Sequence, residues 1–238
     1  RNNLRLGASQ IKLMAGGGVS SLYDQLEDVQ YFEDELHAAV MAAEDAGTYV
    51  MVHVYVPEAI RRAIRAGVKS IEHGQLIDEP TMKLIAEKGV WLSMQPFIGE
   101  GNNHYTNPVQ QAKHELVVQG TDRAYQLAKK YGVKLAWGTD LLFSPANARN
   151  QNLNIEKMTR WFSNFEILKM ITHDNAELLA LSGRRNPYPG KLGVIEEGAL
   201  ADLIVVDGNA LEDIKVLTDP GKNMLLIMKD GKIYKNDL

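Results

Sequence analysis

The chain has 238 residues, of which 45% are hydrophobic and 24% charged, with a formal net charge of -4 and no cysteine. This is globular composition, sufficient for one large domain or for a domain with an appendage. The sequence has no apolar run of the roughly 18 residues that a membrane span needs, and no like-charge block that would bind nucleic acid. The lack of cysteine excludes disulfides, cysteine-ligated zinc and a thiol nucleophile, and the location in the cell stays undetermined.

The first predicted strand, residues 6–14, is short and apolar but carries Lys12 in its second half. Lysine is almost never fully buried unless it is paired, so Lys12 is either a functional group or points to solvent from an edge strand. Gly16-Gly17-Gly18 follow, and their backbone can bend sharply or approach a ligand closely. Three glycines alone are weak support for a phosphate-binding loop, and these alternatives stay open.

Residues 48–78 are predicted to form a strand, a helix and a second strand. The first strand covers the apolar, β-branched residues 49–54, and the second covers 68–72. Successive parallel strands end at the same edge of a sheet, so His53 and His73, one at each strand end, are expected to lie close together. A lone histidine there is more often a structural core residue, but paired imidazoles are a candidate transition-metal site.

Strands and helices continue to alternate along the chain. Asp140 comes at the end of a predicted strand. An aspartate there is usually a turn residue or a helix cap, but its register with the preceding candidates favours metal binding or proton transfer. The polar loop 96–107 is suited to line a substrate pocket, and His104 in it is a weak candidate for substrate contact. The other predicted elements are helices at 35–46, 78–88 and 108–131, the last broken near Gly120, and strands at 90–95 and 133–138.

The last quarter of the chain changes in texture. A predicted pair of helices at 164–182 is followed by short strands and turns, so we predict a domain boundary near Arg185. Asp230-Gly231 is a typical two-residue hairpin turn. The predicted strands of this region are 193–196, 201–206, 224–229 and 232–235.

Four segments, taken in order, resemble the metal-site motifs of the metal-dependent amidohydrolase superfamily. They are Ile-Lys at Lys12, His-Val-Tyr at His53, Glu-His-Gly at His73 and Gly-Thr-Asp at Asp140. The lysine strand continues into M-A-x-G-G-V-x-S and the first histidine into Y-x-P-x-A-I-x-x-A. Both resemble the imidazolonepropionase-like branch, with its prolidase-type dipeptidases and carboxypeptidases. N-A-E-L-L-A-L-S-G, followed by L-G-V-I-E-E-G-A-L-A-D-L-I-V-V-D, is similar to the exit of that barrel into a small β-sandwich.

The resemblance implies an α/β fold, a (β/α)8 TIM barrel. Residues 1–185 would supply strands four to eight of the barrel, and residues 186–238 would supply part of the small β-sandwich. It also implies a zinc-dependent hydrolase with two metal ions, which cleaves an amide bond in a dipeptide or another N-acyl amino acid.

The resemblance also assigns roles to individual residues. Lys12 would be a carbamylated (carboxylated) lysine that bridges the metals, since a carbamate is an anionic oxygen donor and an ammonium is not. His53 and His73 would bind one metal, and Asp140 would bind the other and accept the proton of the attacking water. Tyr55 would contact the substrate carbonyl or carboxylate, although an ordinary buried tyrosine is an equally good interpretation.

One departure from the family pattern affects these expectations. The family begins with a His-x-His pair on its first barrel strand, and no two of the six histidines here are separated by one residue. Five strands cannot close an eight-stranded barrel. We therefore expect these residues to be the C-terminal part of a longer protein, with the N-terminal part supplied by another chain or lost by proteolysis. A homo-oligomer stays open as a separate alternative. The alternatives are a non-catalytic or incomplete subunit of a split barrel, and a barrel of different chemistry whose glycine loop holds phosphate.

Overall fold

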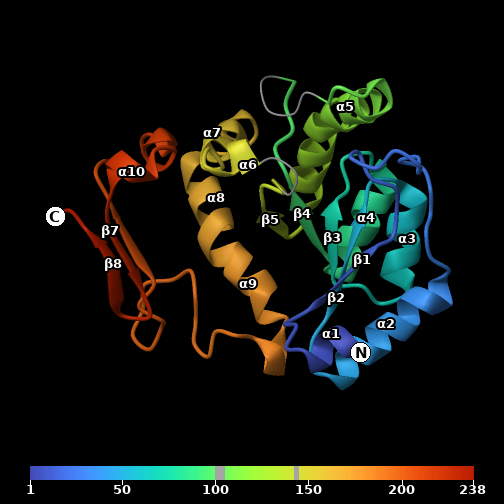
Figure 1. Cartoon of the computed structure of the whole chain (residues 1–238), viewed down its shortest axis with the longest axis horizontal. Coiled ribbons are helices and arrows are strands. Elements are labelled where there is room, and N and C mark those ends of the chain that lie inside the picture. The colour runs from blue at the N-terminus through green and yellow to red at the C-terminus, as the bar shows by residue number, and fades with distance from the viewer. Residues whose placement is uncertain (100–104, 142–144) are drawn as a thin grey trace. The chain divides into compact units, whose positions relative to one another are not determined.

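The computed structural model describes residues 1–99, 105–141 and 145–238. Its central feature is a parallel sheet in which the strands follow one another in chain order, β1-β2-β3-β4-β5. A helix connects each strand to the next, so the chain is an α/β protein, as predicted (Figure 1). The strands are β1 (Ile11–Met14), β2 (Val50–Val54), β3 (Ser70–His73), β4 (Trp91–Met94) and β5 (Leu135–Trp137).

The helices beside this sheet begin and end at residues that the sequence marks clearly. Asp78 caps α4 by accepting a hydrogen bond from the Thr81 amide at 2.9 Å, and Gly89 ends α4 in the left-handed conformation with φ 62°. The predicted break of the long helix at Gly120 is wrong, because α5 continues through it. The helices are α1 (Asn2–Arg5), α2 (Glu33–Asp45), α3 (Pro57–Arg65), α4 (Glu79–Lys88) and α5 (Pro108–Tyr131).

One face of the parallel sheet is apolar and covered by helices. The register pairs Val52 with Ile71 and Ile71 with Leu92, and all three side chains are fully buried. Helices α2 and α3 pack against β2, and Figure 1 shows α2, α3 and α4 on the same side of the sheet. Each such side chain contributes about 1.5–3 kcal/mol by its removal from water, so this face stabilises the sheet.

The opposite face of the sheet carries polar groups. Side chains alternate between the two faces of a strand, and the register places His53, Glu72 and Ser93 in one row across β2, β3 and β4. Lys12 lies on the same face, opposite Met51, and is exposed because β1 is an edge strand of the sheet. A buried cluster of Tyr49, Trp91, Ala136 and Leu178 lies at the other end of the strands. The carboxyl ends of the strands are thus where this face offers reactive side chains.

The chain divides into two compact units, and the parallel sheet belongs to the first, Arg1–Gly138 with Leu178–Pro187. The second unit, Thr139–Glu177 with Tyr188–Leu238, contains an antiparallel sheet in the order β6-β7-β8 and several short helices. The elements from residue 139 onward are α6 (Pro145–Ala148), α7 (Leu153–Lys157), η1 (Met158–Arg160), α8 (Asn164–Lys169), η2 (Met170–Asp174), α9 (Asn175–Ala180), η3 (Gly183–Arg185), β6 (Leu203–Val206), η4 (Ile214–Leu217), α10 (Pro220–Asn223), β7 (Met224–Lys229) and β8 (Lys232–Asn236).

The C-terminal region follows the predicted pattern with two differences. The turn between β7 and β8 forms at Asp230-Gly231, both with positive φ (50° and 74°), as the dipeptide predicted. Residues 193–196 form no strand, and the predicted helix pair at 164–182 is joined by the π-helical turn η2. The domain boundary near Arg185 stays a prediction. Within the described ranges, none of the helices has the length and apolar character to cross a bilayer.

Candidate active site

Two imidazoles meet at the carboxyl ends of β2 and β3. The register places His53 opposite Glu72 and His73 opposite Val54, so simple alternation would send the two rings to opposite faces. His73 escapes that alternation because its backbone is left-handed, with φ 81°. Its ring lies against the ring of His53, with 4.4 Å between the centroids and 71° between the planes. The expectation that the two histidines lie close together is therefore correct.

The turn after His73 depends on a glycine. Gly74 also has a positive φ, 71°, and a Cβ atom there would come within 2.9 Å of the Leu92 side chain. Its amide donates a hydrogen bond to the Val54 carbonyl at 2.9 Å, which ties the end of β3 to the end of β2. The Glu-His-Gly motif thus has a structural reason, because two successive left-handed residues turn the imidazole toward its neighbour.

Each imidazole is held by a hydrogen bond from one of its own two ring nitrogens. His53 Nε2 lies 3.0 Å from the Gly17 carbonyl oxygen and His73 Nδ1 lies 2.6 Å from Gln95 Oε1. Since both partners are oxygen acceptors, these two nitrogens carry the hydrogens and donate. In the neutral rings the lone pairs are then on His53 Nδ1 and His73 Nε2. Metal-binding imidazoles are held in the same way, with the second ring nitrogen donating to an oxygen.

Burial and charge keep His73 neutral at physiological pH. Burial lowers the pKa of His73 well below its ordinary value, and the nearby charges of His53 and Lys12 lower it further, against the opposing hydrogen bond to Gln95. A neutral imidazole is the form that can donate a lone pair. The charge of Lys12 is the smallest of these influences on His73.

Lys12 lies on the histidine side of the sheet. The register places Met14 opposite His53, and Lys12 is two residues before Met14 on the same face. Lys12 is exposed at a sheet edge, which is also what the solvent-facing interpretation expects. In the parts of the chain that the structure describes, no three or more His, Cys, Asp or Glu side chains form a group that could hold a metal. The ligand role of Lys12 stays a prediction.

The ring of Tyr55 lies next to both imidazoles. Its ring centroid lies 5.1 Å from the ring of His53 and 5.1 Å from the ring of His73. It is buried, in a cluster with Val19, Leu26 and Val117. The structure therefore places Tyr55 beside the imidazoles, and its contact with a substrate stays a prediction.

The other two candidates are less well defined by the structure. Asp140 follows β5 and has a left-handed backbone, φ 50°, but it lies in the second compact unit, so its approach to the histidines stays a prediction. His104 lies outside the described residues. From the loop 96–107, the described Phe97 and Tyr105 pack against the cluster that contains Tyr55.

A buried lysine that the sequence analysis missed lies behind the site. Lys113, on α5, is only 4% exposed, and its ammonium binds the carbonyls of Gly18 at 3.1 Å and Ser21 at 2.9 Å. It also binds the carbonyl and the carboxylate of Asp24, the latter at 3.3 Å. The signal was present, because Lys113 lies on the stripe with Val117 that α5 buries.

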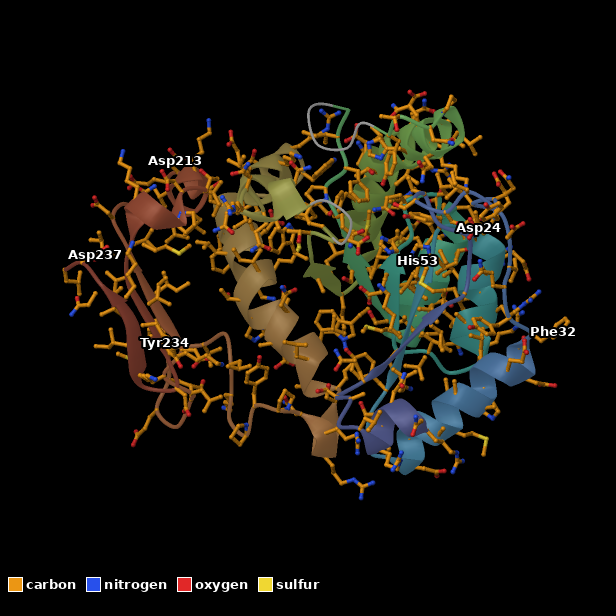
Figure 2. All side chains as sticks on the ribbon, viewed as in Figure 1. Asp24, Phe32, His53, Asp213, Tyr234 and Asp237 are labelled. Atoms are coloured by element: carbon orange, nitrogen blue, oxygen red, sulfur yellow. The ribbon has the colours of Figure 1, made fainter. Side chains whose placement is uncertain are left out.

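These contacts define the role of the glycine segment. The Gly17 carbonyl accepts from His53, and the Gly18 amide donates to the Asp24 carboxylate at 3.2 Å. A Cβ atom at Gly17 would lie 1.8 Å from the Gln25 carbonyl oxygen, so this position requires glycine. The contacts favour a structural role for the three glycines over a phosphate-binding one. Figure 2 marks Asp24 and His53, which both belong to the first unit.

Comparison with known proteins gives a family match over nearly the whole chain. The model of the Amidohydrolase family matches residues 1–234. The chain is 34% identical to an ochratoxinase of Aspergillus niger over 239 aligned positions, which cover 99% of this chain and 48% of that protein. It therefore spans about half the length of this curated relative.

Solved structures of similar proteins also match nearly the whole chain. A prolidase complexed with N-methylphosphonate-L-proline is 37% identical with a TM-score of 0.89, and the match covers 99% of this chain and 57% of that one. A Xaa-Pro dipeptidase with bound methionine is 32% identical with a TM-score of 0.84, with the same coverage of both chains.

Proposed function

Because the chain belongs to the amidohydrolase family, we propose that it carries the metal-binding part of a hydrolase that cleaves amide bonds in dipeptides or other N-acyl amino acids. The similar proteins include a prolidase, a Xaa-Pro dipeptidase and an ochratoxinase. Two of these names describe cleavage next to proline, which makes dipeptides the first substrates to test. Carboxypeptidase activity, which releases a C-terminal residue, would act on substrates of the same class.

One observation carries this proposal. Two imidazoles lie 4.4 Å apart between ring centroids, and each has one nitrogen held by an oxygen acceptor. Neutral imidazole nitrogens suit zinc and other transition metals. His53 would bind through Nδ1 and His73 through Nε2, the nitrogens opposite their hydrogen bonds. The donors in this chain therefore fit a divalent metal.

Lys12 and Asp140 would complete the donor set of a two-zinc centre. An ammonium cannot bind a cation, so Lys12 would act as a carbamate formed with carbon dioxide. Asp140 would bind the second metal through its carboxylate, and in the chain it comes three residues after β5. Both roles fit the chemistry of oxygen donors.

The reaction would divide between the bound metal and the side chains. When bound, the metal would supply Lewis-acid activation of the scissile carbonyl and of a water. Asp140 would take a proton from that water and return it to the leaving amine. Tyr55 would orient the substrate by a hydrogen bond from its phenol to the carbonyl or carboxylate. The burial of Tyr55 beside both imidazoles supports this role, because its ring cannot rotate away freely.

The described sheet is open, and this motivates a proposal about architecture. In the parallel sheet, β1 and β5 are the two edges. We infer that residues 1–185 form strands four to eight of a (β/α)8 barrel and residues 186–238 part of a small β-sandwich. The remaining strands would come from the N-terminal part of the same protein or from another chain. Without them the chain would be a non-catalytic piece of a split barrel, the second candidate function.

Metal analysis and substrate screening test both candidates. Mass spectrometry of the full-length protein under native conditions should give about two zinc ions per site, and a dipeptide and N-acyl amino acid library should contain a substrate. Asp140→Asn should abolish that activity and leave the fold intact. A protein with zinc bound but no activity toward any library member would favour the non-catalytic alternative. A protein without metal would contradict the hydrolase.

A further inference from the structure

Lys113 is a buried cation whose contacts all lead to one loop. Its ammonium binds oxygens of Gly18, Ser21 and Asp24, which span the first part of the connection from β1 to α2. The Asp24 carboxylate in turn accepts the Gly18 amide at 3.2 Å and the Gln30 side chain at 3.2 Å. The loop is thus folded around the ammonium, which lies on a different element, α5.

This loop supplies the hydrogen-bond acceptor of a proposed metal ligand. Gly17 precedes Gly18, the first residue held by Lys113, and the Gly17 carbonyl accepts from His53 Nε2 at 3.0 Å. A second constraint comes from the close approach of Gly17 to the Gln25 carbonyl, which only a glycine permits. Gly17 is therefore held at two points: Lys113 binds the carbonyl of the next residue, Gly18, and the Gln25 carbonyl packs closely against the Gly17 backbone.

We propose that Lys113 is a positioning residue, whose ammonium holds the loop 17–24 so that the Gly17 carbonyl keeps the hydrogen of His53 on Nε2 and its lone pair on Nδ1. This inference rests on the proposed metal-binding function. Lys113 would act indirectly, by holding the carbonyl of Gly18 and so the neighbouring carbonyl of Gly17 that faces His53. A ligand whose ring is held in the wrong tautomer cannot present that lone pair, so loss of the clamp would weaken metal binding.

The test compares Lys113→Met with Lys130→Met in the full-length protein. Methionine keeps most of the length of the lysine side chain and removes the ammonium. Lys130 is on the same helix and also forms an ion pair, with Glu79 at 2.7 Å, but it is exposed at the surface. We expect Lys113→Met to weaken zinc affinity about tenfold, the lower end of the effect of outer-shell partners, and Lys130→Met to leave it unchanged. Competition with a chromophoric chelator measures both.

Two further readouts separate positioning from a general loss of stability. The visible spectrum of the cobalt-substituted protein reports the ligand geometry, and it should shift in Lys113→Met only. In Lys113→Met, chymotrypsin should also cleave faster after Tyr23 than it does in the wild type, because the ammonium no longer holds this loop. Tyr23 is 96% exposed there. If Lys113→Met does not fold, Asp24→Asn replaces it, because it keeps the backbone acceptors and removes the carboxylate.

The possible outcomes distinguish this inference from the function on which it rests. A folded Lys113→Met protein with the zinc affinity and cobalt spectrum of the wild type would overturn the positioning role and leave the hydrolase proposal standing. A wild-type protein that binds neither zinc nor cobalt would overturn the metal centre itself, before any variant is compared. A weaker affinity with a shifted spectrum, absent from Lys130→Met, would support the inference.

Discussion

The two faces of the parallel sheet differ in what their side chains do. On the helix-covered face, Val52, Ile71 and Leu92 are fully buried and carry no polar group. On the other face, the same strands carry His53, Glu72 and Ser93. Successive side chains along each strand point to opposite faces. Residues that stabilise the sheet and residues that offer reactive groups therefore alternate in the sequence but lie on different faces. Substitutions on the two faces should therefore affect different measurements.

The largest effect is expected on the polar face. His73→Ala removes one of the two imidazoles and should lower amide hydrolysis by about a thousandfold, because metal activation supplies several kcal/mol of transition-state stabilisation. Steady-state kinetics and zinc content of the full-length protein measure the loss. His37→Ala is the matched control, since His37 is exposed on α2 and its Nδ1 lies 3.3 Å from the Ala66 carbonyl oxygen. Equal activity of His73→Ala and His37→Ala would exclude the proposed site.

The apolar face should show the next largest effect, in stability. Ile71→Ala removes a fully buried side chain from the centre of the sheet and should cost about 2–5 kcal/mol of unfolding free energy. Urea denaturation followed by circular dichroism measures this cost. Ile233→Ala, in the exposed strand β8, should cost less than about 1 kcal/mol because its side chain is 47% exposed. Equal urea midpoints for the two variants would show that burial at Ile71 does not stabilise the fold.

A third substitution should affect both stability and zinc affinity. Gly17→Ala places a methyl group 1.8 Å from the Gln25 carbonyl oxygen, so the backbone must shift, at a cost of about 1–3 kcal/mol. The shift also moves the acceptor of His53, so zinc affinity should fall with stability. Gly99→Ala is the control, because a methyl group there meets its nearest atom at 3.9 Å. Loss of stability with unchanged zinc affinity would show that the carbonyl does not hold the ligand.

The smallest expected effect depends on pH. Burial raises the pKa of Asp24, but hydrogen bonds from Ser21 and Gly18 and the charge of Lys113 outweigh it and hold the pKa below its ordinary value. A lowered pKa stabilises the folded protein at pH values above the unfolded pKa of about 3.9, and this contribution is lost as the pH falls through the folded pKa.

Asp24→Asn removes that contribution. The difference in unfolding free energy between wild type and variant should therefore be largest near neutral pH and shrink as the pH falls below the unfolded pKa of about 3.9. Urea titrations at several pH values measure it. Asp237→Asn, which changes an exposed aspartate (Figure 2), should give a small difference at every pH. A difference for Asp24→Asn that grows on acidification would contradict the sign of the shift.

The sequence predicted what depends on local pattern. The strand ends at His53 and His73, the cap at Asp78 and the turn at Asp230-Gly231 all follow from periodicity or from the conformational preferences of single residues. Because parallel strands end at a common edge, the meeting of the two histidines could be predicted as well.

What the sequence did not predict depends on contacts between distant segments. Gly120 does not break α5; it lets the helix pass the carbonyl of Gln75, which a Cβ atom would approach to 2.3 Å. The left-handed backbone of His73 could not be predicted from the fact that the residue is a histidine. Lys113 interrupts an apolar helix stripe, and only the loop around Asp24 explains it. In each case the partner lies more than twenty residues away or in the backbone itself.

The backbone of His73 also limits which residues could ever replace it. Only a few side chains enter the left-handed region readily, with asparagine and aspartate foremost among those other than glycine, and β-branched residues are excluded. Of these, aspartate alone is a strong donor to cations, and it prefers harder ions than imidazole does. A protein descending from this one could therefore exchange nitrogen for oxygen at position 73 in a single step, while thioether or long carboxylate donors would first require the strand to end differently.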